Sequence, residues 1–366
     1  MAFKDALYLW QLKLRQKTAA LVCFADRSGT PRIKQVSGPR SRILFVLAGL
    51  LGDSVMSQPV VAAAREIWPS ARITVLGSTH NRELLKADPN IDEFFVCDAD
   101  PFSLRRSAEI AKLKKWLPEQ SFDAAIILLG DQFAHLLARA GIPLRVGVKG
   151  TILEPCLTHA YDIGSPREWG WSERLNSLRV LGNDVADRIP RLYVDPMAAQ
   201  TAAKKLSQSG LLPGEKYIAF HPFGSTRRQW WPTEKVPDFI REVESRWGIR
   251  VVLLGGKETQ AAKISLERLI DTRGRLSVSE LLAVISGSQL VVTTDSGPFH
   301  IAGALGKPIV GLFRARRPEH ANGYPTAKII FGREPKCDQQ CDWDRCSADP
   351  CRQMATISVE SIFSSK

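Results

Sequence analysis

The chain has 366 residues, 44% of them hydrophobic and 24% charged, which is enough for about two domains with separate cores. Its 26 glycines and 22 prolines are near average usage and exclude collagen-like and low-complexity classes. No uncharged run reaches the ~18 to 20 apolar residues that cross a bilayer as a helix, and the N-terminus lacks a signal-peptide pattern. We therefore expect a cytoplasmic protein.

Lysine and arginine number 50 against 38 acidic residues, a net charge of +12, and half of this excess lies in the first 40 residues. Leu7, Trp10 and Leu14 follow near-helical spacing in this basic N-terminal extension, residues 1–40. Two interpretations are open. The segment forms a helix on an anionic membrane surface, or it forms a surface helix packed on the fold.

From residue 42 onward, apolar strands alternate with helical segments, a pattern typical of a parallel sheet with crossover helices. The apolar run at 42–48 predicts a central strand that is covered on both faces. Further strands are predicted at 71–77, 93–97, 122–129 and 144–148, and helices at 53–68, 82–87 and 104–117.

A second alternation follows a proline-containing stretch at 187–196. Its strands are predicted at 217–220, 250–254, 289–294 and 308–313. The sequence therefore predicts an α/β protein with domains at 41–190 and 191–366. In open parallel sheets ligands bind outside the carboxyl ends of the strands, so we expect a site in a cleft between the domains.

The segment after the strand at 289–294 suits a phosphate group. Asp295 or Ser296 can cap the next helix, and Pro298 fits its first turn. Ser296 and Gly297 then present backbone amides at the positive end of the helix dipole, and His300 can donate to the same anion. The alternative is an ordinary capped helix with a buried histidine.

The run from Asp295 to Val310, with the sequence Asp-Ser-Gly-Pro-Phe-His at its start, closely resembles the nucleotide-sugar motif of the heptosyltransferases in glycosyltransferase family 9. Three earlier segments resemble that family's other motifs in the same order: Leu-Leu-Gly-Asp53 with Pro59, Phe220 to Pro232, and Leu276 to Leu282. The resemblance covers residues 42–351. It implies the GT-B fold, in which two Rossmann-like domains with parallel sheets face an inter-domain cleft, the donor in the C-terminal half and the acceptor in the N-terminal half.

The resemblance also implies an activity. Family members transfer a heptose from ADP-heptose to a Kdo or heptose sugar of the lipopolysaccharide inner core, with inversion and without a catalytic metal. The acceptor is then an anionic, lipid-linked saccharide at the inner face of the inner membrane. Asp53 matches the family's base, with capping of the next helix as its alternative role. Gly52 beside it would let the backbone approach the acceptor.

A second group of residues is implied to bind the donor. Four residues follow a strand and can hold a diphosphate: Ser225, Thr226, Arg227 and Arg228. Many family members place a lysine two residues before the Trp-Pro pair, whereas this chain has Gln229. Either Arg228 supplies the charge or the donor is bound differently, so another nucleotide-sugar or a protein acceptor is the second interpretation. Glu258 matches a family acid that contacts the donor ribose, or it is simply a carboxylate at a helix N-terminus.

Two arginines and a cysteine cluster complete the candidates. Arg105 and Arg106 fall where the family's acceptor-binding basic stretch lies, with a solvated helix face as the alternative. Four thiols within 15 residues are close enough for one structural zinc or iron ion, with disulfides or free thiols as alternatives: Cys337, Cys341, Cys346 and Cys351.

Two other classes of protein fit less well. A basic nucleic-acid-binding protein with a zinc module would explain the charge and the cysteines but not the glycine turns or the 295–300 motif. We therefore expect no nucleic-acid partner. An inactive scaffold is disfavoured because both Asp53 and Asp295 are present.

Overall fold

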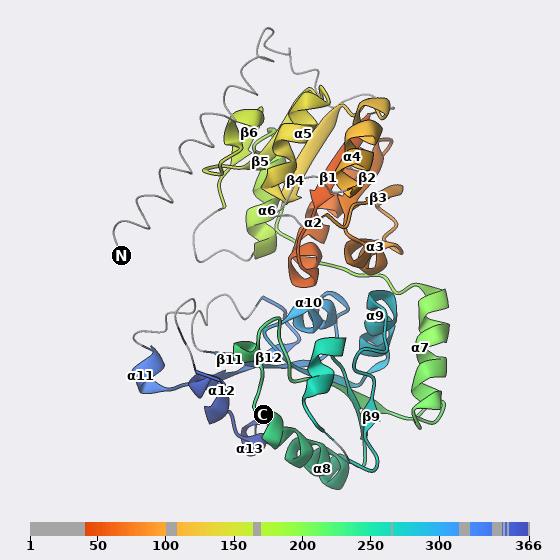
Figure 1. Cartoon of the computed structure of the whole chain (residues 1–366), viewed down its shortest axis with the longest axis vertical. Helices are drawn as coiled ribbons and strands as arrows, with labels where there is room; N and C mark the ends of the chain where they lie inside the picture. Colours follow the sequence, from red (N-terminus) through yellow and green to blue (C-terminus); the bar gives the residue numbers. More distant parts are fainter. Residues whose placement is uncertain are drawn as a thin grey trace. The chain divides into compact units, whose positions relative to one another are not determined.

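The computed structural model describes residues 41–99, 108–163, 170–264, 266–314, 323–338, 346, 348–349 and 351–364. These residues divide into two compact units between Arg188 and Ile189. Each unit has one six-stranded sheet in which every strand pairing is parallel. Figure 1 draws the strands as arrows coloured along the sequence. The α/β class with parallel sheets is confirmed.

The sheet of the N-terminal unit has the order β3-β2-β1-β4-β5-β6. Its strands are β1 (Arg42–Leu47), β2 (Arg72–Gly77), β3 (Glu93–Val96), β4 (Ala124–Leu129), β5 (Leu144–Val148) and β6 (His159–Tyr161). Its helices are α2 (Leu51–Ile67), α3 (Thr79–Leu85), α4 (Ala108–Glu119), α5 (Ala134–Arg139) and α6 (Gly170–Arg179), with short 3-10 turns at Asp131–Phe133 and Glu154–Cys156. The chain winds outward from β1 in one direction and from β4 in the other, so the switch point lies between these two strands.

The sheet of the C-terminal unit repeats this topology in the order β12-β11-β10-β7-β8-β9, with its switch point between β7 and β10. Its strands are β7 (Tyr217–His221), β8 (Arg250–Leu253), β9 (Ile270–Asp271), β10 (Leu290–Thr294), β11 (Ile309–Arg314) and β12 (Ala327–Gly332). Its helices are α7 (Pro196–Gln208), α8 (Val236–Trp247), α9 (Val278–Gly287), α10 (Gly297–Ala304), α11 (Pro335–Asp338), α12 (Arg352–Thr356) and α13 (Val359–Phe363), with 3-10 turns at Arg227–Gln229, Thr233–Lys235 and Lys257–Ala261.

Local sequence explains most element boundaries. In β1, residues 43–47 are completely buried, as a continuous apolar run on a doubly covered strand requires. Helix α3 begins at Thr79, three residues before the expected start at 82. The cause is a capping box. The backbone N of Asn81 donates to Ser78 Oγ at 3.2 Å, while the backbone N of Ser78 donates to Asn81 Oδ1 at 2.7 Å.

The Trp-Pro pair at 231–232 has a packing role in the C-terminal unit. Trp231 is fully buried, and its indole Nε1 donates to the carbonyl of Ile357 at 3.0 Å. Lys235 Nζ donates to the carbonyls of Ala355 and Ile357 at 2.6 and 2.9 Å, and desolvation lowers the pKa of this amine. These bonds attach the 355–357 segment to the start of α8. None of the helices in the described ranges is both long and apolar enough to cross a bilayer.

Candidate active site

Asp53 lies in the first turn of α2, just after β1 ends at the switch point of the N-terminal sheet. The helix begins at Leu51 with Leu50 as its N-cap, so the alternative role of Asp53 as the capping residue is wrong. The carboxylate is 37% exposed, and its Oδ1 lies 3.1 Å from Nη2 of Arg174 on α6. Asp53 is therefore an accessible carboxylate with one oxygen already held by a cation.

Residues on either side fix the turn that carries Asp53. A Cβ on Gly49 would lie 2.7 Å from Leu129 Cδ1, so a side chain here would force Leu129 at the end of β4 to shift. Asn81 is fully buried, and its Nδ2 donates to Ser54 Oγ at 2.7 Å and to the Gly49 carbonyl at 3.2 Å. Gly52 lies within the first turn of α2. Sequence reasoning missed Asn81, although its spacing from Ser78 marks a helix cap.

In the C-terminal unit, two loops meet at the switch point. His221 ends β7 and pairs in register with Thr293 of β10. Thr294 ends β10, and its hydroxyl donates to the carbonyl of Phe223 in the loop that follows β7. The loops after β7 and β10, which carry most of the predicted donor residues, are therefore bonded to each other.

Gln229 strengthens this connection between the two loops. Its Oε1 accepts from Ser225 Oγ at 2.8 Å and from Thr226 N at 3.1 Å, and its Nε2 donates to the carbonyl of Asp295 at 3.4 Å. A Cβ on Gly224 would lie 2.4 Å from Cβ of Gln229, so glycine is needed there. A lysine side chain cannot accept the bonds from Ser225 and Thr226. Gln229 thus shapes the loop in this chain.

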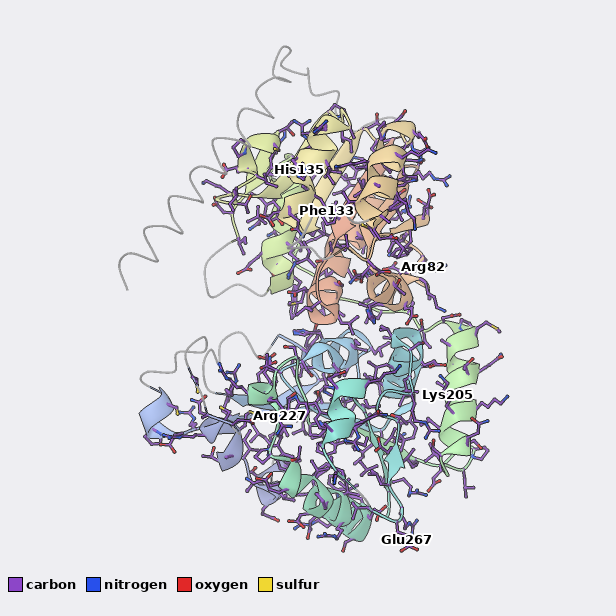
Figure 2. The ribbon with its side chains drawn as sticks, in the orientation of Figure 1. Arg82, Phe133, His135, Lys205, Arg227 and Glu267 are labelled. Carbon is purple, nitrogen blue, oxygen red and sulfur yellow. The ribbon has the colours of Figure 1, made fainter. Side chains whose placement is uncertain are left out.

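The two arginines of this loop differ in surroundings. Arg227, which is labelled in Figure 2, is exposed. Its guanidinium carbon lies 4.7 Å from the centroid of the Trp230 ring, and its Nε lies 3.5 Å from Asp349 Oδ2. Arg228 beside it is half-buried. The loop after β7 therefore carries two cationic side chains next to Ser225 and Thr226.

Helix α10 begins at the same switch point. Ser296 is its N-cap, but the hydroxyl makes no capping bond and instead contacts His221 Nδ1 and Thr293 Oγ1, each at 3.2 Å. Within the described residues, the N-cap side chain makes no capping bond to the first-turn amides next to Gly297, which leaves anion binding there as a proposal. His300 Nδ1 lies 3.3 Å from the Tyr324 hydroxyl.

Burial reduces the charge at this switch point. Desolvation lowers the pKa of His221 to about 4, so the imidazole is neutral at neutral pH. The Asp295 side chain reaches the surface, yet desolvation raises the pKa of its carboxyl, and the guanidinium of Arg314 opposes the rise. The neutral imidazole of His221 beside Ser296 adds no positive charge, so an anion at this place would depend on backbone amides and on other side chains.

Glu258 lies in the exposed 3-10 turn after β8, the strand next to β7. Its place in the first turn agrees with the alternative of a carboxylate at a helix N-terminus and leaves the ribose role as a proposal. Arg273, only 4% exposed, holds this turn: its Nη1 donates to the carbonyls of Thr259 and Ala262 at 2.7 and 2.8 Å. Arg273 is a second residue that sequence reasoning missed.

Several candidates fall outside the described residues, namely Arg105, Arg106 and Cys341. Cys337 lies in α11, and Cys351 is the N-cap of α12 and is buried in the core of the C-terminal unit. Within the described part of the chain, no three histidine, cysteine or acidic side chains form a group that could hold a metal ion.

Known proteins agree with this architecture. Lipopolysaccharide heptosyltransferase 2 of Escherichia coli K12 is 25% identical over 303 residues, which cover 76% of this chain and 84% of the relative. A family 9 glycosyl transferase from Veillonella parvula superposes with a TM-score of 0.74 at 21% identity, covering 88% of this chain and 95% of the other. The structure of E. coli ADP-heptose LPS heptosyltransferase II superposes with a TM-score of 0.71 at 20% identity, covering 88% of this chain and 96% of the other.

The structural likenesses confirm the expected GT-B fold. Residues 110–350, more than half of the chain, match the model of glycosyltransferase family 9 (heptosyltransferase). With two parallel doubly wound sheets, a carboxylate at one switch point and a helix start at the other, the chain belongs to glycosyltransferase family 9 and is a glycosyltransferase.

Proposed function

We propose that this protein transfers a heptose from ADP-heptose to a Kdo or heptose sugar of the lipopolysaccharide inner core, with inversion of the anomeric centre. The observation that carries the proposal is the position of Asp53. Its Oδ1 is paired with Arg174, and its Oδ2 accepts no hydrogen bond from the described residues. An accessible carboxylate oxygen at a switch point is suited to accept the proton of an acceptor hydroxyl.

The proposed step is a single displacement. Asp53 Oδ2 takes the proton of the acceptor hydroxyl while the hydroxyl oxygen attacks the anomeric carbon of the donor. The bond from that carbon to the diphosphate oxygen breaks, and its electron pair leaves with ADP. Charge that develops on the diphosphate is stabilised by hydrogen-bond donors already in place. No metal or other cofactor takes part in this scheme.

Residues around the switch point of the C-terminal sheet are proposed to hold the donor. The amides of Ser296 and Gly297 and the side chains of Arg228 and His300 would bind the diphosphate, with Asp295 at the edge of this group. Hydroxyls of Ser225 and Thr226 lie in the same loop, which Gln229 holds against Asp295. Glu258 would contact the ribose.

Gln229 also supports a second candidate function. The family's frequent lysine would bring a charge to this loop, whereas Gln229 brings a loop-shaping hydrogen-bond network. The same fold would then use another nucleotide-sugar donor, or a protein acceptor. Product formation with a different nucleotide-sugar, and none with ADP-heptose, would select this candidate.

The acceptor side of the proposal rests on charge. Arg105, Arg106 and Gly52 would face an anionic, lipid-linked saccharide. The net charge of +12 would favour encounter with it and with the inner face of the inner membrane, in a cytoplasmic protein that is peripheral to that membrane. A structural zinc or iron ion at the four cysteines is a separate proposal, which metal analysis of the purified protein would test.

The proposal is tested with Asp53→Asn. We expect kcat to fall by about 100- to 10,000-fold, because an amide cannot accept the acceptor proton. The assay follows ADP release from ADP-heptose with a Kdo-containing lipid acceptor, and ADP binding is measured in parallel to show that the donor site is intact. Glu66→Gln is the matched control, since Glu66 lies at the other end of α2 and also pairs with an arginine, Arg188, at 2.7 Å. Full activity of Asp53→Asn would refute the assignment of the base.

A further inference from the structure

We infer that Arg174 is a positioning residue that holds the carboxylate of Asp53 in its reactive orientation. This inference rests on the proposed role of Asp53 as the base. Arg174 lies on α6, which packs along α2, and its Nη2 is 3.1 Å from Asp53 Oδ1. The two residues are 121 positions apart, so the fold alone brings them together.

The guanidinium is fixed at both ends. Its Nη1 donates to the carbonyl of Gly170 at 2.8 Å, one helical turn earlier, while Nη2 reaches the carboxylate. The Arg174 side chain is only 15% exposed. A planar fork held on two sides sets the direction from which it approaches a carboxylate.

Gly170 provides the space for this arrangement. A Cβ at Gly170 would lie 2.9 Å from Met56 Sδ and 3.3 Å from Arg174 Nη1. A side chain at residue 170 would therefore press on Met56 of α2 and on the guanidinium of Arg174.

Asp53 is the anionic partner of this cation. Among the described residues, Arg174 forms an ion pair with no other carboxylate. Tyr161 is also close, but burial raises the pKa of its hydroxyl to about 12, so the ring stays neutral. The pair uses Oδ1 and leaves Oδ2 for substrate, and it limits the rotation of a side chain that is otherwise partly exposed. Arg174 would thus act on the reaction through Asp53, without touching substrate.

The test compares Arg174→Met, Arg174→Lys and Arg179→Met in the full chain. Arg179 is the matched control because it lies on the same helix and pairs with Asp187 at 2.6 Å, away from Asp53. We expect Arg174→Met to lower kcat by about 10- to 100-fold, the scale of a small misplacement of a reacting group, with KM for ADP-heptose within about twofold. Arg174→Lys keeps the charge and is expected to recover much of the loss. Arg179→Met is expected to keep kcat within about twofold.

The double variant Asp53→Asn/Arg174→Met separates positioning from other effects. If Arg174 acts through Asp53, the double variant is no slower than Asp53→Asn alone. The inference would be overturned if the losses of kcat in the two single variants added up in the double variant. It would also be overturned if Arg174→Met and Arg179→Met lost kcat equally and in proportion to their loss of thermal stability. A fully active Asp53→Asn would instead refute the proposed base, so the two failures are distinguishable. Loss in Asp53→Asn with full activity in Arg174→Met would refute the positioning role alone.

Discussion

At the scale of single residues, His221 offers a pH-dependent test of the C-terminal switch point. The folded protein holds the pKa of this histidine at about 4, below the ordinary value of 6.5. Between these two pH values the unfolded chain binds a proton that the folded chain does not, so protonation favours unfolding. Stability from this group is complete above about pH 6.5 and is lost as the pH falls toward 4. Each pH unit in this window is worth at most about 1.4 kcal/mol.

The variant His221→Gln removes this titration. We expect its free energy of unfolding in urea to change less between pH 7 and pH 4.5 than that of the wild-type protein. Ser296→Ala is the control, because it removes the 3.2 Å contact of the imidazole but leaves the histidine in place. The control should therefore keep most of the wild-type pH dependence. Identical pH dependence in wild type and His221→Gln would contradict the low pKa.

Single residues also show where sequence reasoning stops. A motif placed Asp53 after the first strand, but its partner Arg174 lies far along the chain on a helix without a motif of its own. From the sequence, Gln229 stood only for the absence of the lysine that many family members have at this place. In the structure its side chain forms hydrogen bonds with Ser225, Thr226 and Asp295. Such partners depend on which strand ends meet in space, and local patterns carry no information about that.

At the scale of elements, the segment from Leu276 to Leu282 proves to be a connection between helices. Ser277 caps α9, and the buried Glu280 accepts from Ser277 N at 2.7 Å and pairs with Lys205 of α7 at 2.6 Å. Lys205 is labelled on α7 in Figure 2. Lys205 Nζ also donates to the carbonyl of Arg275 at 2.9 Å. The segment that resembles a family motif therefore has a structural role here, joining α7 to the start of α9.

This arrangement predicts two graded losses of stability. Ser277→Ala should cost about 1 kcal/mol, the usual effect of losing a capping side chain. Glu280→Ala should cost about 2 kcal/mol, because it removes both the capping bond and a partly buried ion pair whose lysine remains. Urea unfolding measures both. Glu242→Ala, which removes an exposed pair with Arg246 on α8, is expected to change stability by less than about 0.5 kcal/mol. An equal effect of Glu280→Ala and Glu242→Ala would contradict this account.

Strands were predictable from the sequence where they consist of an uninterrupted run of apolar residues. The buried strands β1 and β4 follow from apolar runs of five and six residues, and β5 was predicted with its observed bounds. The strands β6, β9 and β12 were missed. Three and two residues are too few to show a pattern in β6 and β9, and β12 is an edge strand whose residues are mostly only half-buried. Helix α2 starts two residues earlier than expected, and this small change moves Asp53 from the capping position into the first turn.

At the scale of the whole molecule, the alternation of strands and helices was enough to predict two parallel sheets. The order of the strands was not available from alternation alone, yet it determines the candidate site, because it places the ends of β7 and β10 side by side. Each unit also has its own hydrophobic core, one including Phe133 and Leu137, the other Phe220 and Trp231. Separate cores predict that each unit melts with its own stability.

The last prediction uses these separate cores to locate the donor. Calorimetry of the full chain should show two transitions, and variants identify them: Glu280→Ala lowers the transition of the C-terminal unit, and Asn81→Ala lowers that of the N-terminal unit. A ligand that binds only the native state stabilises it by about 2.7 kcal/mol at 100 times its dissociation constant. We expect ADP and ADP-heptose to raise only the transition that Glu280→Ala lowers, whereas UDP and GDP leave both in place. If another nucleotide raised that transition instead, the donor would still be assigned to the C-terminal unit, but ADP-heptose would be rejected as the donor. A rise in the transition that Asn81→Ala lowers would reject the donor site at the start of α10, because binding energy stabilises the unit whose groups make the contacts.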